Sequence, residues 1–164
     1  MHSCWRTLTL GVVLALGVAL GADIATLSAQ ASDPRMGTWK LNVAKSKYSP
    51  GPAPQSQTLK VEASGQGEKV TSEGVNAAGM PIMTQYTANF DGKDYPLTGS
   101  QNVDTLSLKR IDARTTERTN KKGDKVVTTS THVVSPDGKT LTATTKGTNA
   151  QGQAVDNVTV WEKQ

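Results

Sequence analysis

Apolar and polar residues alternate with a period of two along most of the chain after the first thirty or so residues. The stretch 38–43 alternates threonine, lysine and asparagine with tryptophan, leucine and valine, and stretches 58–63 and 82–90 repeat the pattern. Such alternation is typical of strands with one buried and one solvated face, and no window has the period of an amphipathic helix. The pattern predicts about ten strands, at residues 38–43, 55–64, 68–75, 82–90, 94–98, 103–111, 112–119, 125–135, 139–146 and 153–163.

Short turns separate these segments. Asp-Gly or Gly-Asp pairs at 91–93, 122–124 and 137–139 accept the positive φ that tight hairpins require. Consecutive strands joined in this way form a meander, and closure removes its exposed edges. We therefore expect an all-β fold, an antiparallel up-and-down β-barrel of about 8–10 strands. A two-sheet sandwich is the alternative, but only residues 44–54 are long enough for a crossing connection.

The first 31 residues read as a separate segment. They contain Arg6, an apolar run at 8–22 and the small-x-small sequence Ala29-Gln30-Ala31, which together predict a signal peptide cleaved after Ala31. An uncleaved anchor is the alternative, but the run is shorter than the roughly 20 residues that span a bilayer. We expect export to the periplasm or the extracellular space, a short lead-in at 32–36, and one barrel domain at 37–164.

Composition limits the chemistry of that domain. The only cysteine, Cys4, lies in the leader, so no disulfide or thiolate site is expected after cleavage. The net charge is +4 and the lysines are spread out, apart from a group at 121, 122 and 125 in a predicted turn. Because no aromatic residues interleave this group, we expect no nucleic-acid partner. The solvent-exposed faces of the predicted strands carry Lys, Glu, Thr and Asn, so a barrel inserted in a membrane is not expected either.

Enzyme chemistry finds little support. His132 is the only histidine after the leader, whereas zinc needs three or four ligands. No serine stands in Gly-x-Ser-x-Gly, and there is no glycine-rich phosphate loop. We therefore predict a protein that is not an enzyme and has no cofactor and no metal. His132 as the axial ligand of a haem remains an open alternative.

The two ends of the domain resemble a known superfamily. Gly37-Thr38-Trp39-Lys40-Leu41 resembles the first-strand motif of the calycins, which include the lipocalins and fatty-acid-binding proteins. The segment 158–163, Val-Thr-Val-Trp-Glu-Lys, resembles the closing strand of the fatty-acid-binding proteins, which typically reads Thr-Arg-Val-Tyr-Glu-Lys. The resemblance implies a barrel around an internal cavity for a small apolar ligand. It also implies that Trp39 is a structural anchor at the closed end.

The sequence departs from that family at two places. Thr159 and Trp161 stand where many fatty-acid-binding proteins use arginine and tyrosine to hold a carboxylate, and neither supplies positive charge. Between the first two strands, the family has a helical lid. Here the segment 44–54 carries prolines at 50, 52 and 54, which exclude a helix. We expect no helical lid, and a stiff crossover in its place, with an extended flap as the alternative.

The strand predicted at 112–119 is a candidate source of a cation for the cavity. Arg114 and Arg118 share one face of it. Facing inward they could bind an anion. Facing outward they would be solvated, with Ile111 and Ala113 turned in, and this orientation is favoured because it buries fewer charges. The predicted ligand-binding residues are Tyr86, Phe90, Leu106, Leu108, Thr159, Trp161, Arg114 and Arg118.

Two functions fit these observations. The first is an exported, monomeric, lipocalin-like protein that holds a small, apolar, largely uncharged ligand inside its barrel. The second is an exported structural or interaction module whose barrel is filled by its own side chains. The volume left inside the barrel distinguishes them.

Overall fold

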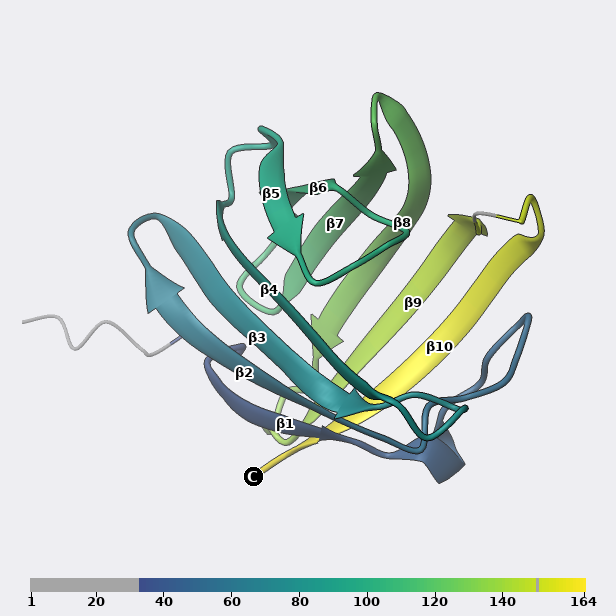
Figure 1. Ribbon diagram of the computed structural model, residues 1–164. Helices are drawn as coiled ribbons and strands as arrows, with labels where there is room; N and C mark the ends of the chain where they lie inside the picture. Colours follow the sequence, from purple (N-terminus) through teal and green to yellow (C-terminus); the bar gives the residue numbers. More distant parts are fainter. Residues whose placement is uncertain (1–32, 150) are drawn as a thin grey trace, which may run out of the picture. The chain divides into compact units, whose positions relative to one another are not determined.

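The computed structural model describes residues 33–149 and 151–164 (Figure 1). The predicted signal peptide at residues 1–31 lies outside the described residues. The elements in chain order are β1 (Gly37–Leu41), the 3-10 turn η1 (Val43–Lys45), β2 (Ser56–Ser64), β3 (Gly67–Val75), β4 (Pro81–Asn89), β5 (Tyr95–Thr98), β6 (Thr105–Arg110), β7 (Thr115–Lys122), β8 (Lys125–Val134), β9 (Thr140–Thr148) and β10 (Ala154–Lys163). No helix in the described part of the chain is long and apolar enough to cross a membrane.

The ten strands form one closed antiparallel barrel. Each strand pairs with its neighbours in the sequence, and β1 pairs with β10 to close the ring, with Trp39 opposite Lys163 and Leu41 opposite Trp161. Figure 1 shows the strands following one another around the barrel. The predicted all-β, up-and-down barrel is confirmed, and the sandwich alternative is wrong. This architecture is the one that the calycin resemblance implies.

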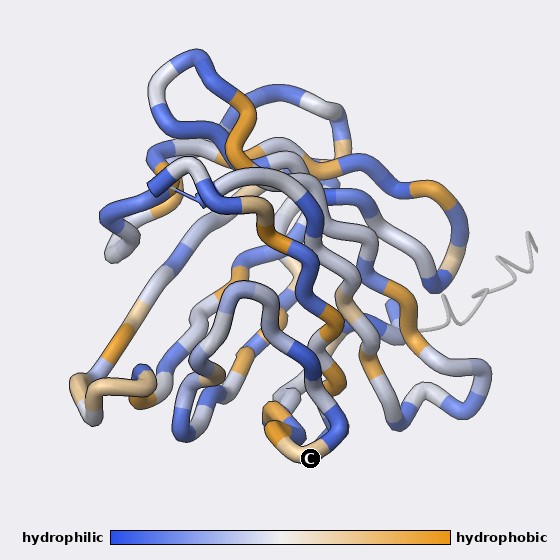
Figure 2. The backbone as a smooth tube through the Cα atoms, turned by 90° about the vertical axis from the view of Figure 1, so that its right-hand side faces the viewer, coloured by the Kyte–Doolittle hydropathy of each residue, from blue (hydrophilic) through white to orange (hydrophobic). Residues whose placement is uncertain are grey.

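The core lies on the inward faces of the strands. Fully buried side chains include Trp39, Leu106, Leu108, Val134 and Leu141. Figure 2 shows the hydrophobic positions as short segments separated by hydrophilic ones along the backbone. This is the period of two that places alternate side chains inside and outside the barrel. The expected position of Trp39 in the core agrees with its exposure of 0%.

The connection from β1 to β2 contains no helical lid. After η1, the main chain of Lys47 exchanges two hydrogen bonds with Val158, at 2.7 and 2.9 Å, and Ser49 O accepts from Asp156 N at 2.8 Å. The segment therefore runs as an extended crossover against β10 up to the prolines, as the sequence predicted. Among the residues described, η1 is the only helical element.

β7 begins later than the sequence predicted. The Asp112 carboxylate accepts hydrogen bonds from the main-chain N–H groups of Arg114 and Thr115, both at 2.8 Å. An Asx turn of this kind offers the backbone an alternative to the sheet ladder. Residues 111–114 therefore form an exposed turn, and the inward and outward positions of β7 are set from Thr115 onward.

Candidate ligand-binding cavity

A cavity of about 300 Å³ lies inside the barrel. This volume is at the small end of the range of about 300–1,000 Å³ that is usual for ligand sites. Its walls come from strands β2 to β5 and β7 to β10, from the loop after β5, and from the crossover. The lining residues are Tyr48, Gln57, Leu59, Val70, Ser72, Thr84, Tyr86, Leu97, Ser100, Val103, Arg118, Asn120, His132, Ala143, Thr145, Thr159 and Trp161.

One part of the wall is apolar. Leu59, Val70 and Leu97 contribute aliphatic side chains, and Trp161 contributes its indole ring. The Trp161 ring is held in place because its Nε1 donates a hydrogen bond to Thr159 Oγ1 at 3.0 Å. Neither residue supplies charge, so the closing strand offers the ligand an aromatic surface and not a carboxylate clamp.

Another part of the wall is polar, and several of its atoms lack a partner. Arg118 Nε, Asn120 Oδ1 and both ring nitrogens of His132 are buried without a hydrogen bond. Asn120 uses only its Nδ2, which donates to Thr128 Oγ1 at 2.9 Å. Buried polar groups are normally paired with protein or ordered water. These atoms lie along one cavity, where they are available to hydrogen-bond with whatever occupies it.

His132 stays neutral in this environment. Burial lowers its pKa well below the ordinary value of 6.5, and the positive charges of Arg35 and Arg118 lower it further. A neutral imidazole has one N–H donor and one acceptor nitrogen. His132 therefore contributes hydrogen bonding to the cavity at neutral pH but no charge.

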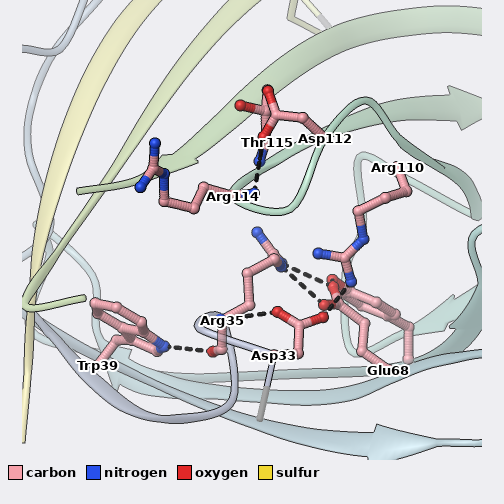
Figure 3. Close-up of polar contacts among 9 residues, drawn as sticks. Asp33, Arg35, Trp39, Glu68, Arg110, Asp112, Arg114 and Thr115 are labelled. Carbon is pink, nitrogen blue, oxygen red and sulfur yellow. Dashed lines mark hydrogen bonds and ion pairs between the residues drawn. The ribbon is translucent and has the colours of Figure 1, made fainter. Parts of the chain in front are cut away.

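A buried ion pair joins the segment before β1 to β3 (Figure 3). Arg35 Nε and Nη2 donate to the two carboxylate oxygens of Glu68 at 2.9 and 2.8 Å. Glu68 Oε1 also accepts from the Tyr86 hydroxyl at 2.7 Å, and the main-chain oxygen of Arg35 accepts from Trp39 Nε1 at 2.8 Å. Burial raises the pKa of Tyr86, so the phenol keeps its proton and acts as the donor. The segment before β1 is thereby fixed inside the barrel.

Sequence reasoning missed this ion pair. Arg35 precedes the first predicted strand, where no periodicity could orient it. The sequence did indicate that Glu68 is buried, because it alternates in step with Val70 and Ser72 on the inward face of β3. A carboxylate at such a position needs a buried cation as partner.

The structure separates the predicted site residues into two groups. Tyr86, Thr159, Trp161 and Arg118 line the cavity, whereas Phe90, Leu106, Leu108 and Arg114 do not. Leu106 and Leu108 pack in the core, with exposures of 0% and 1%. Phe90 lies under the guanidinium of Arg110, whose Cζ is 4.0 Å from the ring centre. These placements leave the binding roles of the first group as predictions.

The favoured orientation of the arginines is wrong for Arg118 and correct for Arg114. Arg114 is exposed, but it belongs to the turn capped by Asp112 and not to the strand (Figure 3). Within β7, Thr116 and Asn120 are buried and Arg118 lies between them on the same inward face. Ile111, expected to turn inward, is 59% exposed, and Ala113 is exposed as well.

No group of three or more His, Cys, Asp or Glu side chains that could hold a metal ion occurs within residues 33–149 and 151–164.

Comparison with known proteins gives a distant structural likeness. No family model and no curated protein sequence matches the chain. Among solved structures, the chain is similar to the zebrafish ileal bile acid-binding protein complexed with cholic acid, with a TM-score of 0.46 and 12% sequence identity over 80% of this chain and 99% of that one. This likeness is too distant to assign the chain to that protein's family, so the function has to be inferred from the residues of the cavity.

Proposed function

We propose that this protein binds a small molecule in the cavity of its barrel. The observation that carries the proposal is a cavity of about 300 Å³ lined both by apolar side chains and by buried polar atoms without partners. A barrel filled only for stability would exclude such atoms or pair them, because an unpaired buried polar group costs about 1–3 kcal/mol. The filled-barrel module is therefore the less favoured function.

The cavity supports a ligand with an apolar body and one polar end. The apolar side chains fit the small apolar ligand expected from the sequence. Arg118, Asn120 and His132 do not fit a wholly apolar, uncharged molecule, because it would leave their polar atoms unpaired. We therefore revise the expected ligand toward an amphipathic one.

Export is part of the proposal and rests on the leader sequence. Arg6, the apolar run and Ala29-Gln30-Ala31 support cleavage after Ala31. Intact mass of protein purified from the periplasm or the culture medium of the native host tests this, with a chain beginning at Ser32 expected. A chain that keeps its leader would contradict it. We also propose that the protein is a monomer, because a closed barrel has no free strand edge.

Filling the cavity tests the binding function. Ala143 lies on the cavity wall in β9 and is 6% exposed, so Ala143→Leu places three extra carbon atoms in the space that the ligand needs. Native mass spectrometry of protein from its own host should show extra mass on the wild type and bare mass on Ala143→Leu, with both variants folded by circular dichroism.

Ala113→Leu is the matched control, because Ala113 is exposed in the turn before β7. It should keep the extra mass. Bare mass on the wild type, together with no binding of an apolar fluorescent dye, would overturn the proposed function and favour the filled-barrel module.

A further inference from the structure

The charged side chains inside the barrel do not balance. Arg35 and Glu68 form an ion pair in which the side-chain exposures are 4% and 0%, so these two charges cancel. Arg118 also lines the cavity, and it forms no salt bridge with any of the described residues. His132 is neutral because burial and the nearby arginines oppose its protonation. One positive charge inside the barrel is left without a partner.

This charge is costly for the empty barrel. A cation taken out of bulk water loses solvation that only an anion or several hydrogen bonds can replace. Arg118 is partly buried and has neither from the protein, and its Nε is buried with no acceptor. A position on β7 that contributed only to stability would be occupied better by an apolar residue. The cost is offset if the cavity takes up a negative charge.

The neighbours of Arg118 suit an anion. Asn120 lies two residues further along the same inward face of β7, and His132 projects from β8, where it pairs with Thr116. A guanidinium offers parallel N–H donors that match the two oxygens of a carboxylate. Neutral His132 can add one N–H, since both of its nitrogens are free. No carboxylate side chain lines the cavity to repel an anion.

We propose that the cavity selects small organic monoanions with an apolar body, and that Arg118 binds their anionic group. This rests on the proposed function, because it names the class of ligand for the same cavity. One unbalanced charge matches a singly charged group such as a carboxylate and not a phosphate dianion. The aliphatic side chains of Leu59, Val70 and Leu97 would cover the body of the ligand.

Octanoate and octanamide test the charge requirement, because they share an apolar chain and differ in one charged group. Isothermal titration calorimetry at neutral pH, with protein shown by native mass spectrometry to be free of ligand, measures both. Wild type should bind octanoate at least tenfold more tightly than octanamide. Arg118→Gln should remove this difference by weakening octanoate binding about tenfold or more, because the charged hydrogen bonds to the carboxylate are lost.

Arg114→Gln is the matched control, since it removes the same charge from the exposed turn just before β7. It should leave both affinities unchanged. Because Arg118 has no protein partner, Arg118→Gln should fold with a thermal midpoint at or above that of the wild type. If it does not fold, Arg118→Lys replaces it, and this variant should bind octanoate more weakly than the wild type because the fork of donors is lost.

The outcomes separate the two proposals. Equal binding of octanoate and octanamide by the wild type, or unchanged octanoate affinity in Arg118→Gln, would overturn the anion inference and leave a cavity that binds neutral molecules. Binding of neither compound to folded wild type would overturn the anion inference, and the proposed function falls as well if the protein from its own host shows bare mass and binds no apolar dye. Both proposals are supported if the wild type and Arg114→Gln bind octanoate more tightly than octanamide, Arg118→Gln loses this difference, and Ala143→Leu does not bind octanoate.

Discussion

Glu68 is completely buried, and its carboxylate accepts hydrogen bonds from Arg35 and Tyr86. Glu68→Gln keeps the size of the side chain but leaves the Arg35 guanidinium buried without a counter-charge. Removing one partner of a buried pair costs about 3–5 kcal/mol, so the free energy of unfolding in urea should fall by that order.

Glu62→Gln is the control for that substitution. Glu62 pairs with Lys60 on the outside of β2, and the side chains are 45% and 60% exposed. Surface pairs contribute little to stability, so the urea midpoint should not move. Equal losses in the two variants would show that the ion pair inside the barrel has no special role in holding the segment before β1.

His132 makes stability depend on pH in a defined window. Its pKa in the folded protein is held well below 6.5 by burial, then by Arg35 and Arg118. The unfolded chain therefore binds a proton that the folded chain does not, and stability is complete above the unfolded pKa and declines as the pH falls through it. From about pH 7.5 to about pH 5.5, the free energy of unfolding should drop by about 1 kcal/mol more than in His132→Gln.

Urea titrations of the two proteins across that window provide the measurement. Surface carboxylates such as Asp91 and Asp104 have pKa values lowered from 3.8 by their hydrogen bonds, so their effects fall at lower pH and do not interfere. Parallel pH profiles for the wild type and His132→Gln would contradict the placement of a neutral imidazole in the cavity.

At the scale of single elements, β2 and β7 show what the sequence could and could not predict. The alternation in β2 holds from Ser56 to Glu62, and its inward residues Leu59 and Val61 were identified correctly, whereas Ala63, expected on the same face, is exposed. In β7 the same alternation was extended through Asp112, whose carboxylate caps a turn. Because the strand begins only after this turn, the alternation of inward and outward faces does not carry over from residue 112 into β7. The orientation of Arg118 could therefore not be derived from that of Arg114.

β5 is the strand with the least backbone pairing. It pairs with β4 at Gln85–Thr98 and Tyr86–Leu97, and with β6 at Tyr95–Leu106 and Pro96–Thr105, whereas β9 and β10 pair along their full lengths. Segments with few hydrogen bonds open at the lowest free energy. In hydrogen-exchange mass spectrometry, amides of β5 should exchange faster than those of β9 and β10.

Ligand binding should slow that exchange. Leu97 on β5 lines the cavity, as do Ser100 and Val103 in the loop that follows, so an occupied cavity supports this part of the wall. For the ligand-free protein, the contrary result would be that the amides of β5 exchange as slowly as those of β9. The small number of backbone hydrogen bonds in β5 would then not determine where the barrel opens.

At the scale of the molecule, the closed meander was predictable and the volume of the cavity was not. Ten alternating segments with tight turns leave few arrangements, and closure by β1 and β10 is the simplest. The volume inside depends on the sum of many side-chain sizes and on which ones pair. The buried position of Arg35 shows this, because a residue outside every predicted strand fills part of the barrel.

Both ends of the barrel domain meet at one place. The Lys163 ammonium donates to the main-chain oxygen of Pro34 at 3.0 Å and lies 5.0 Å from the centre of the Trp39 ring, while Gln164 N donates to Thr38 O at 2.9 Å. Neighbouring strands of the barrel are consecutive in the chain except for β10 and β1, which are joined by hydrogen bonds alone. This junction lies where the two ends of the domain are already in contact. A short peptide could join these ends, and a new start could be cut in the exposed turn at Gly123, giving a circular permutant with the same strand order and the same interior.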